Sequence, residues 1–324
     1  MKNGKFSIGR FMRKNVILLL LIAMIIVFSI AQPKFFTVTN LMNIYNQNAS
    51  LMLSACGLAM VMISGGIDLS IGYMASLCGI VAAMLMKNMN VNFIVSIIAA
   101  ILVGTLCGAL NGILSNKLKI HTMIVTLATM TLFQGLSYII SQSKSFSSLP
   151  AAFKFIGQGY LGNLPVSIFA LIAIVAVVSF ILNKTHYGRY VYAIGGNPDA
   201  AHLAGINVER VRLRTFALNG ALVGLAAVLL ISRSGSASSA MGTSLQFDSI
   251  TACILGGVSF TGGSGKGSNA VLGVLCLGVL SNGMQLIGWG IYVQYVVKAI
   301  LLVIAIAFDM YTKNKVLADD AANG

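Results

Sequence analysis

Long apolar runs recur along almost the whole chain, and they constrain its fold more than any other feature. Of the 324 residues, 57% are hydrophobic and only 9% are charged. A soluble domain carries roughly 25% charged residues, whereas a helix that crosses a bilayer needs about 20 apolar residues. The sequence therefore predicts an all-α integral membrane protein with a single domain, residues 1–324, and no separate soluble domain.

About ten of these runs are long enough to predict transmembrane helices. The predicted spans are Val16–Gln32, Asn48–Ser64, Leu69–Met86, Phe93–Ser115, Thr122–Ser141, Leu164–Leu182, Thr215–Ile231, Leu245–Gly262, Ala270–Gly288 and Ile291–Tyr311. The eighth run is rich in glycine and is the least regular of them. The first run ends in Ser29-Ile30-Ala31, which resembles a signal-peptide cleavage site, but its length favours a retained first span.

The distribution of Lys and Arg predicts the orientation of these spans. If the N-terminus is cytoplasmic, ten spans leave a set of segments on the cytoplasmic side. These segments hold Lys2, Lys5, Arg10, Arg13, Lys14, Lys117, Lys119, Lys184, Arg189, Arg210, Arg212, Arg214, Lys266, Lys313 and Lys315. The opposite segments hold only Lys34, Lys87, Lys144, Lys154 and Arg233. By the positive-inside rule we expect both termini in the cytoplasm, although one misplaced span would invert half of this assignment. The net charge of +14 lies mostly in loops, so we expect membrane lipid and no nucleic acid as a partner.

The longest polar interruption, residues 183–214, contains a short helix with its own capping signals. Asn197 is a suitable N-cap residue, and Pro198 suits the first helical position, which needs no N–H. Asp199 places a negative charge at the positive end of the helix dipole, and Gly205 can end the helix in the left-handed conformation. Such a loop can contact a partner or be an ordinary solvated connection, and capping alone does not separate the two.

Ionisable groups within the apolar runs are candidates for a translocation pathway, because burying them in a bilayer costs about 2.5–3.5 kcal/mol each. Asp68 follows Gly65 and Gly66, which permit a broken helix, and precedes Ser70. It either caps the third span through backbone N–H groups or lines a polar path. Asp248, at the start of the eighth span, has the same two interpretations.

Amide side chains in the spans offer both donors and acceptors to a hydroxyl-rich solute. Asn111 and Asn282 are the amides we take as pathway candidates, and the wider set includes Gln134, Asn219, Gln285 and Gln294. Hydrogen bonding between helices is the competing use. Lys298, within the last span, is expected to extend its ammonium group toward the membrane interface.

Two short sequence matches indicate an internal duplication. Asp68-Leu69-Ser70-Ile71 corresponds to Asp248-Ser249-Ile250, and Ala109–Gly112 corresponds to Leu280–Gly283. Units five spans apart face opposite ways, so the pattern predicts the inverted repeat that is common in transporters.

No catalytic or cofactor site emerges from the sequence. The glycine-rich stretch 256–268 fails the P-loop pattern, because Phe260 stands at the position of the first Gly and Gly267 follows Lys266 where Ser or Thr is required. The three His residues are scattered, and the five Cys residues lie in apolar runs without a CxxC pair. We expect small buried core roles for the cysteines, no bound metal, no enzyme activity and no ATP bound by this chain.

Four stretches carry a resemblance to a known family. They are SGGIDLSIG at Ser64–Gly72, AIGGNPDAAHLAGINVERVR at Ala193–Arg212, LGGVSFTGGSGKG at Leu255–Gly267 and LGVLSNGMQLIG at Leu277–Gly288. Together, and in this order, they resemble the ribose/galactose/xylose-type permeases of bacterial ABC importers. The segment DAAHLAG, with Asp199, Ala200, Ala201 and Gly205, is similar to the acid-Ala-Ala-x-x-x-Gly loop of such permeases, with Asp in place of the commoner Glu.

The resemblance implies a permease subunit in the bacterial plasma (inner) membrane that moves a monosaccharide, ribose first among the candidates, into the cytoplasm. It implies that residues 183–214 form the coupling loop, with Asn197 to Ala201 and Gly205 seated against a separate ATPase subunit that binds ATP and Mg. It also implies an extracytoplasmic sugar-binding protein and a second permease copy, identical or related. The alternative is an ion-coupled secondary transporter for a small polar solute, in which Asp68 or Asp248 carries coupling protons.

Overall fold

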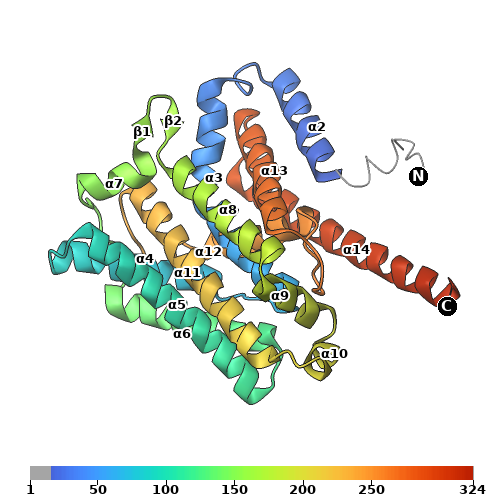
Figure 1. Cartoon of the computed structure of the whole chain (residues 1–324). Coiled ribbons are helices and arrows are strands. Elements are labelled where there is room, and N and C mark those ends of the chain that lie inside the picture. The colour runs from blue at the N-terminus through green and yellow to red at the C-terminus, as the bar shows by residue number, and fades with distance from the viewer. Residues whose placement is uncertain (1–15, 324) are drawn as a thin grey trace.

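The protein is a bundle of helices (Figure 1), and the computed structural model describes its residues 16–323. The basic residues before Val16, which contribute to the predicted orientation, lie outside this described part. The helices are α2 (Val16–Ala31), α3 (Val38–Ile63), α4 (Ile71–Asn88), α5 (Phe93–Leu118), α6 (Thr122–Ser141), α7 (Ala151–Gln158), α8 (Ser167–Lys184), α9 (His186–Gly196), α10 (Pro198–Leu203), α11 (Val208–Ser234), α12 (Thr243–Leu255), α13 (Gly267–Leu286) and α14 (Ile291–Asn323). A short antiparallel ribbon joins β1 (Tyr160–Leu161) to β2 (Leu164–Pro165), with Leu161 opposite Leu164.

The core of the bundle lies around α3, α4 and α11. The apolar windows of α4 and α11 are each 67% buried, whereas those of α5 and α6 are each 28% buried and that of α14 is 0% buried. A helix that is hydrophobic all round is buried by protein or by lipid, so the outer helices present the surface that suits a bilayer. All five cysteines are buried and unbridged, as predicted.

Small residues let α5 and α11 approach closely. The stripe Gly104–Gly108–Gly112 on α5 faces α11, and a Cβ at Gly108 would overlap the carbonyl oxygen of Phe216. A Cβ at Gly112 would lie 2.9 Å from the Cα of Leu213. These glycines therefore serve close helix packing.

Seven of the described helices are long and apolar enough to cross a membrane: α4, α5, α6, α8, α11, α13 and α14 up to Tyr311. These helices and the family identified below make the chain a multi-pass membrane protein. Each of the other three predicted spans overlaps a helix: α2 is an apolar helix of 16 residues, α3 has 26 residues with a polar first half, and α12 has 13.

The predicted eighth span, Leu245–Gly262, is wrong in its extent. Helix α12 ends at Leu255, and 13 residues reach only about 20 Å at 1.5 Å per residue. Gly257 has a φ of 75° and ends the helix in the left-handed conformation. The N-terminus of α12 is reached by the non-helical residues 235–242, where the N–H of Gly242 donates to Oγ of Ser76 at 3.0 Å. The eighth segment is therefore a short helix that begins beside the first turns of α4.

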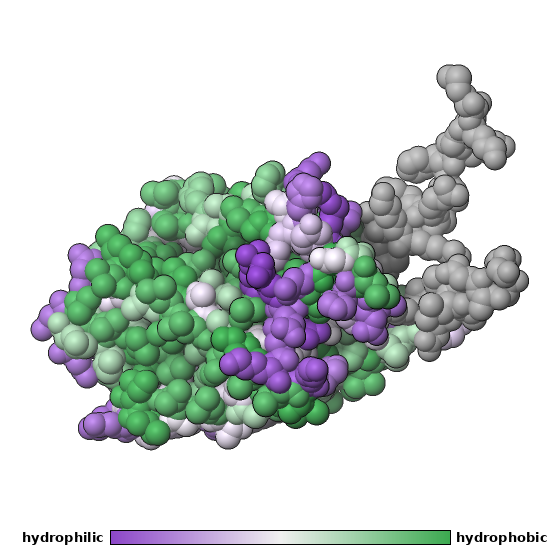
Figure 2. Space-filling model, turned by 60° about the horizontal axis from the view of Figure 1, so that its bottom comes forward, coloured by the Kyte–Doolittle hydropathy of each residue, from purple (hydrophilic) through white to green (hydrophobic). Residues whose placement is uncertain are grey.

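The two ends of the bundle differ in their connections. One end, called the α7 end here, carries α7 and the β ribbon, and the other, called the α10 end, carries α9, α10 and the turn between α5 and α6 (Figure 1). Figure 2 turns the lower side of that view forward and shows hydrophilic residues gathered in a band between broad hydrophobic surfaces. The polar loop 183–214 belongs to the α10 end.

Candidate functional site

Helix α10 is capped as the sequence predicts. Oδ1 of Asn197 accepts hydrogen bonds from the N–H groups of Asp199 and Ala200, each at 3.0 Å, and Pro198 occupies the first turn. Gly205 has a φ of 82°, and its N–H donates to the carbonyl of His202 at 2.9 Å. The caps satisfy backbone groups at both ends of a helix of only six residues, so α10 is a defined element of the loop.

The side chains of α10 face outward. Apart from Ala201, which is buried, its residues are exposed, and Leu203 is 87% exposed. Leu203 is the most exposed large hydrophobic side chain in the described part of the chain. Leu203 was not among the predicted site residues, and only its place in DAAHLAG could have suggested it.

A cavity of about 850 Å³ lies between α10, the start of α11 and the turn between α5 and α6. Its lining includes the charged or titratable residues Lys119, His121, Asp199, His202, Glu209 and Arg212. Gly65, at the end of α3, also lines it. The cavity therefore extends from the capped helix to the end of α3.

The break between α3 and α4 holds a buried polar network centred on Asp68, which is 0% exposed. Oδ1 of Asp68 accepts from the N–H of Ser70 at 2.9 Å and from its hydroxyl at 2.6 Å. Oδ2 accepts from Nδ2 of Asn219, on α11, at 2.9 Å. Nδ2 of Asn111, on α5, lies 3.4 Å from both carboxylate oxygens, and its Oδ1 accepts from the hydroxyl of Thr129 at 2.6 Å.

Side chains of α6 satisfy the unpaired backbone of the same break. The N–H of Ile67 donates to Oγ1 of Thr122 at 3.0 Å, and the N–H of Leu69 donates to Oγ1 of Thr126 at 3.1 Å. Non-helical backbone at membrane depth is tolerated only where protein or a polar cavity supplies such partners. The break is therefore stabilised by tertiary contacts as well as by the bonds between Ser70 and Asp68 within it.

The structure brings five of the predicted pathway residues together. Gly65, Gly66, Asp68 and Ser70 form the break, and Asn111 contacts the carboxylate and the hydroxyl of Ser70, the latter at 2.9 Å. Asp68 also accepts from a backbone N–H at the start of α4. This N–H belongs to the residue before the helix, and α4 has no side-chain capping bond. The interpretations of Asp68 as a helix cap and as part of a polar path both stay predictions.

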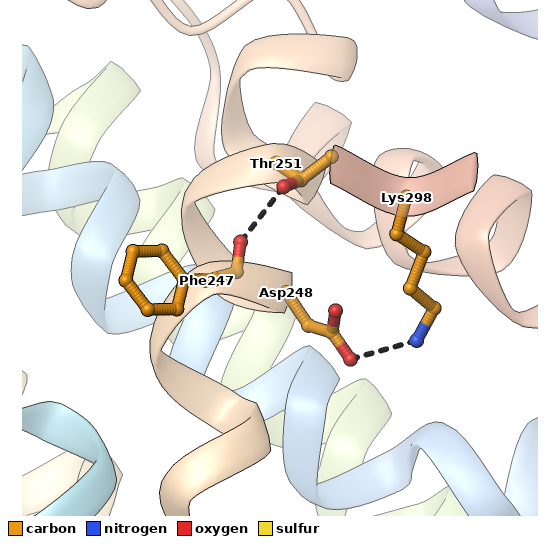
Figure 3. Close-up of polar contacts among 4 residues, drawn as sticks. All are labelled: Phe247, Asp248, Thr251 and Lys298. Carbon is orange, nitrogen blue, oxygen red and sulfur yellow. Dashed lines mark hydrogen bonds and ion pairs between the residues drawn. The ribbon is translucent and has the colours of Figure 1, made fainter. Parts of the chain in front are cut away.

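Asp248 lies apart from this network and forms an ion pair with Lys298 (Figure 3). Nζ of Lys298 is 2.9 Å from Oδ2 of Asp248, and the two side chains are 20% and 21% exposed. Lys298 is seven residues into α14, or about 10 Å along its axis. A carboxylate on α12 therefore pairs with Lys298, and the expected extension of its ammonium group toward the membrane interface stays a prediction.

Asn282 also lies apart from Asp68. It exchanges two amide hydrogen bonds with Asn40, of 2.8 and 3.0 Å, which join α13 to α3. This is the competing use that the sequence left open for the amides. Asn219 likewise forms a hydrogen bond between distant segments, because its amide donates to Asp68.

Among the described residues, no group of three or more His, Cys, Asp or Glu is placed to hold a metal ion. The polar groups instead cluster at the non-helical connection between α3 and α4 and on an exposed, capped loop at one end of the bundle. Non-helical backbone with buried polar groups between membrane helices is a feature of transport proteins, so the fold and both sites place the chain in this class.

Sequence comparison agrees with that class and narrows it to a family. The chain belongs to the family described as the permease component of the branched-chain amino acid transport system, which matches residues 40–306. The chain is similar to the ribose import permease protein RbsC of Haemophilus influenzae, with 36% identity over 323 residues, 98% of this chain and 100% of that protein.

Two further relatives have comparable identity. The ribose import permease protein RbsC of Bacillus subtilis is 38% identical over 292 residues, 89% of this chain and 90% of that protein. The L-arabinose transport system permease protein AraH of Escherichia coli is 36% identical over 308 residues, 95% of this chain and 94% of that protein. No solved structure matches the chain significantly. The family-level resemblance in the sequence is therefore confirmed.

Proposed function

We propose that this chain is the permease subunit of an ATP-driven ABC importer that moves a monosaccharide, ribose first among the candidates, into the bacterial cytoplasm. The observation that carries the proposal is the match to a ribose import permease along 98% of the chain. The exposed, capped helix α10 supports it, because a transporter driven by a separate ATPase needs a defined contact for that partner.

The proposed complex contains this chain, a second permease copy, cytoplasmic ATPase subunits and an extracytoplasmic sugar-binding protein. ATP and Mg belong to the ATPase partner, since stretch 256–268 lacks the P-loop pattern. Asn197 to Ala201, Gly205 and Leu203 form the contact with the ATPase. Coupling requires that this contact differ in energy between the two states of the transporter.

The proposed membrane arrangement has ten membrane segments, with α12 as a short one, and both termini in the cytoplasm of a multi-pass inner-membrane protein. The α10 end is then cytoplasmic, in agreement with the excess of Lys and Arg there. The proposed inverted repeat is supported by two non-helical entries, residues 64–70 before α4 and residues 235–242 before α12. The two helices run in opposite directions in this arrangement, as inverted halves require.

The ion-coupled alternative is not favoured. The relatives described above are permeases, and a further relative from Escherichia coli is described as a probable ABC transporter permease protein. Neighbouring reading frames for an ATPase and a secreted binding protein would support the importer, whereas proton-driven uptake by the chain alone would support the alternative.

Reconstitution tests the proposal directly. The permease, its ATPase and its binding protein are placed in proteoliposomes, and labelled ribose, arabinose, galactose and xylose are compared. We expect uptake that requires internal ATP and the binding protein. Uptake that a proton gradient drives without ATP would overturn the assignment as an ABC importer. A preference for another sugar would overturn only the choice of ribose as the substrate.

A variant at the end of α10 tests the coupling assignment. Gly205→Val places a β-branched residue at a φ of 82°, at a cost of about 1–3 kcal/mol, and should abolish co-purification of the ATPase. Gly288→Val is the matched control, because Gly288 has a φ of 88°, follows a helix in the same way and has open space around it. If both variants retain the ATPase equally, α10 is not its contact.

A further inference from the structure

Glycines from three distant segments meet beside the break between α3 and α4. They are Gly65 after α3, Gly195 near the end of α9, and Gly262 and Gly263 in the loop between α12 and α13. We call these four residues the glycine junction. It joins the segment that holds Asp68 to the loop that carries α10.

The contact is made by backbone atoms alone. The N–H of Gly263 donates to the carbonyl of Ile63, the last residue of α3, at 2.9 Å. A Cβ at Gly195 would overlap the same carbonyl oxygen and lie 2.7 Å from the nitrogen of Gly263. A Cβ at Gly262 would lie 2.7 Å from the Cα of Gly65. A side chain at Gly195 or Gly262 would therefore push the segments apart.

The junction is firmly connected to α10. Only Asn197 separates the end of α9 at Gly196 from the start of α10 at Pro198. The N–H of Asn197 donates to the carbonyl of Ala193 at 3.1 Å, while its side chain caps α10. A displacement of α10 therefore moves the end of α9 with it.

A second bond fastens α9 to the glycine-rich loop. The hydroxyl of Tyr192 donates to the carbonyl of Gly265 at 2.8 Å. Burial raises the pKa of the Tyr192 phenol, so the group stays protonated and remains a donor. The same loop contacts α14, because Oδ2 of Asp309 accepts from the N–H of Phe260 at 3.0 Å.

On the membrane side, the junction is three residues from the polar network. Gly65 has a φ of 81°, and Asp68 follows it in non-helical backbone. The N–H groups of Ile67 and Leu69 are held by α6. A shift at Gly65 would therefore act on a segment held by side chains of α5, α6 and α11.

We infer that Gly195 is a positioning residue for transport. Because it has no side chain, α9 packs directly against the backbone of Ile63 and Gly263, and this contact transmits movement of α10 to the segment that holds Asp68. The inference rests on the proposed function, since it requires that an ATPase move α10. It assigns a role to the glycine-rich stretch 256–268, which the failed P-loop pattern left without one.

Two adjacent glycines supply the test. Gly195→Ala inserts a methyl group into the junction, whereas Gly196→Ala, the matched control on the same helix, meets no atom within 4 Å. The full complex is assayed in proteoliposomes for sugar uptake and for ATP hydrolysis. We expect Gly195→Ala to keep ATP hydrolysis while uptake per ATP falls at least about fivefold, the lower end of common coupling factors. Gly196→Ala should behave as the unmodified protein.

A purely structural role would lower assembly, hydrolysis and uptake together, without changing uptake per ATP. If Gly195→Ala fails to assemble, Tyr192→Phe provides the test, because it removes the hydrogen bond to Gly265 without adding atoms. Loss of this one hydrogen bond should lower uptake per ATP about two- to tenfold. Tyr190→Phe, at an exposed tyrosine of the same helix, is its control.

The possible results separate the inference from the proposed function. An unmodified complex without ATP-driven uptake would refute the proposed function. If the unmodified complex couples uptake to ATP hydrolysis, and uptake per ATP is unchanged in Gly195→Ala, only the role of the glycine junction is overturned. Where Gly195→Ala does not assemble, an unchanged uptake per ATP in Tyr192→Phe has the same meaning.

Discussion

Replacing Asp68 by Asn is expected to destabilise the fold, because every group that forms a described hydrogen bond with its carboxylate is a donor. Oδ1 accepts from the N–H and hydroxyl of Ser70, and Oδ2 accepts from Nδ2 of Asn219. An amide offers an acceptor on one side only. If its oxygen stays toward Ser70, its NH2 group faces the NH2 group of Asn219.

The expected loss of stability depends on the acceptor atom of Asn219. Its Oδ1 is buried without a hydrogen-bond partner among the described atoms, so a half-turn of the amide gives the new NH2 group an acceptor. The cost of Asp68→Asn is then the loss of hydrogen bonds to a charged group, about 1–3 kcal/mol. Asp68→Ala leaves all the donors unpaired at about 1–3 kcal/mol each. At about 2.1 cal/mol/K per residue, the 324 residues give about 1.5 °C per kcal/mol, so Asp68→Asn should lower Tm by about 1.5–4.5 °C, and Asp68→Ala by more.

Thermal unfolding of the purified protein in detergent, at one scan rate, measures these shifts. The matched control is the double variant Asp68→Asn with Asn219→Asp, which moves the carboxylate across the same contact and should recover most of the lost Tm. An unchanged Tm for Asp68→Asn with lost uptake would refute this account, because the carboxylate would then act on the solute. A double variant less stable than both single variants would also contradict it.

Three further predictions concern other contacts. Leu203→Asp should weaken ATPase binding about 10-fold or more in a pull-down, because full burial of a leucine contributes about 1.5–3 kcal/mol, and undiminished binding would remove this residue from the contact. Lys298→Met should lower Tm by leaving Asp248 unpaired at membrane depth, and adding Asp248→Asn should restore it; no recovery would show that the ion pair is not the cause. Gly108→Leu should prevent folding by overlap with α11, judged by monodispersity in detergent, whereas Gly135→Leu, where nothing lies within 4 Å, should be tolerated.

The capped loop was predictable in detail because its caps are local. Asn197 bonds to residues two and three positions on, and Gly205 bonds to a residue three positions back. Residue type and spacing therefore determine such contacts before the chain folds. The role of Leu203 is different, since exposure depends on what the rest of the chain leaves uncovered.

The eighth span shows where a hydropathy pattern stops being informative. Residues 256–262 are apolar enough to extend a predicted span, yet the helix ends at Leu255. The left-handed backbone of Gly257, with a φ of 75°, ends the helix regardless of the hydropathy that follows. Hydropathy measures transfer into a bilayer, whereas helix ends depend on backbone geometry.

The membrane class, the approximate position of most spans and the caps of α10 could be predicted, because they follow from local composition and spacing. Which polar groups meet depends instead on how the helices pack. Asp68 contacts Asn219, 151 residues away, while the comparable Asp248 pairs with Lys298, 50 residues away. Within a bilayer a buried polar group must find its partner on a neighbouring helix, and the packing of the helices, not their composition, determines which neighbour that is.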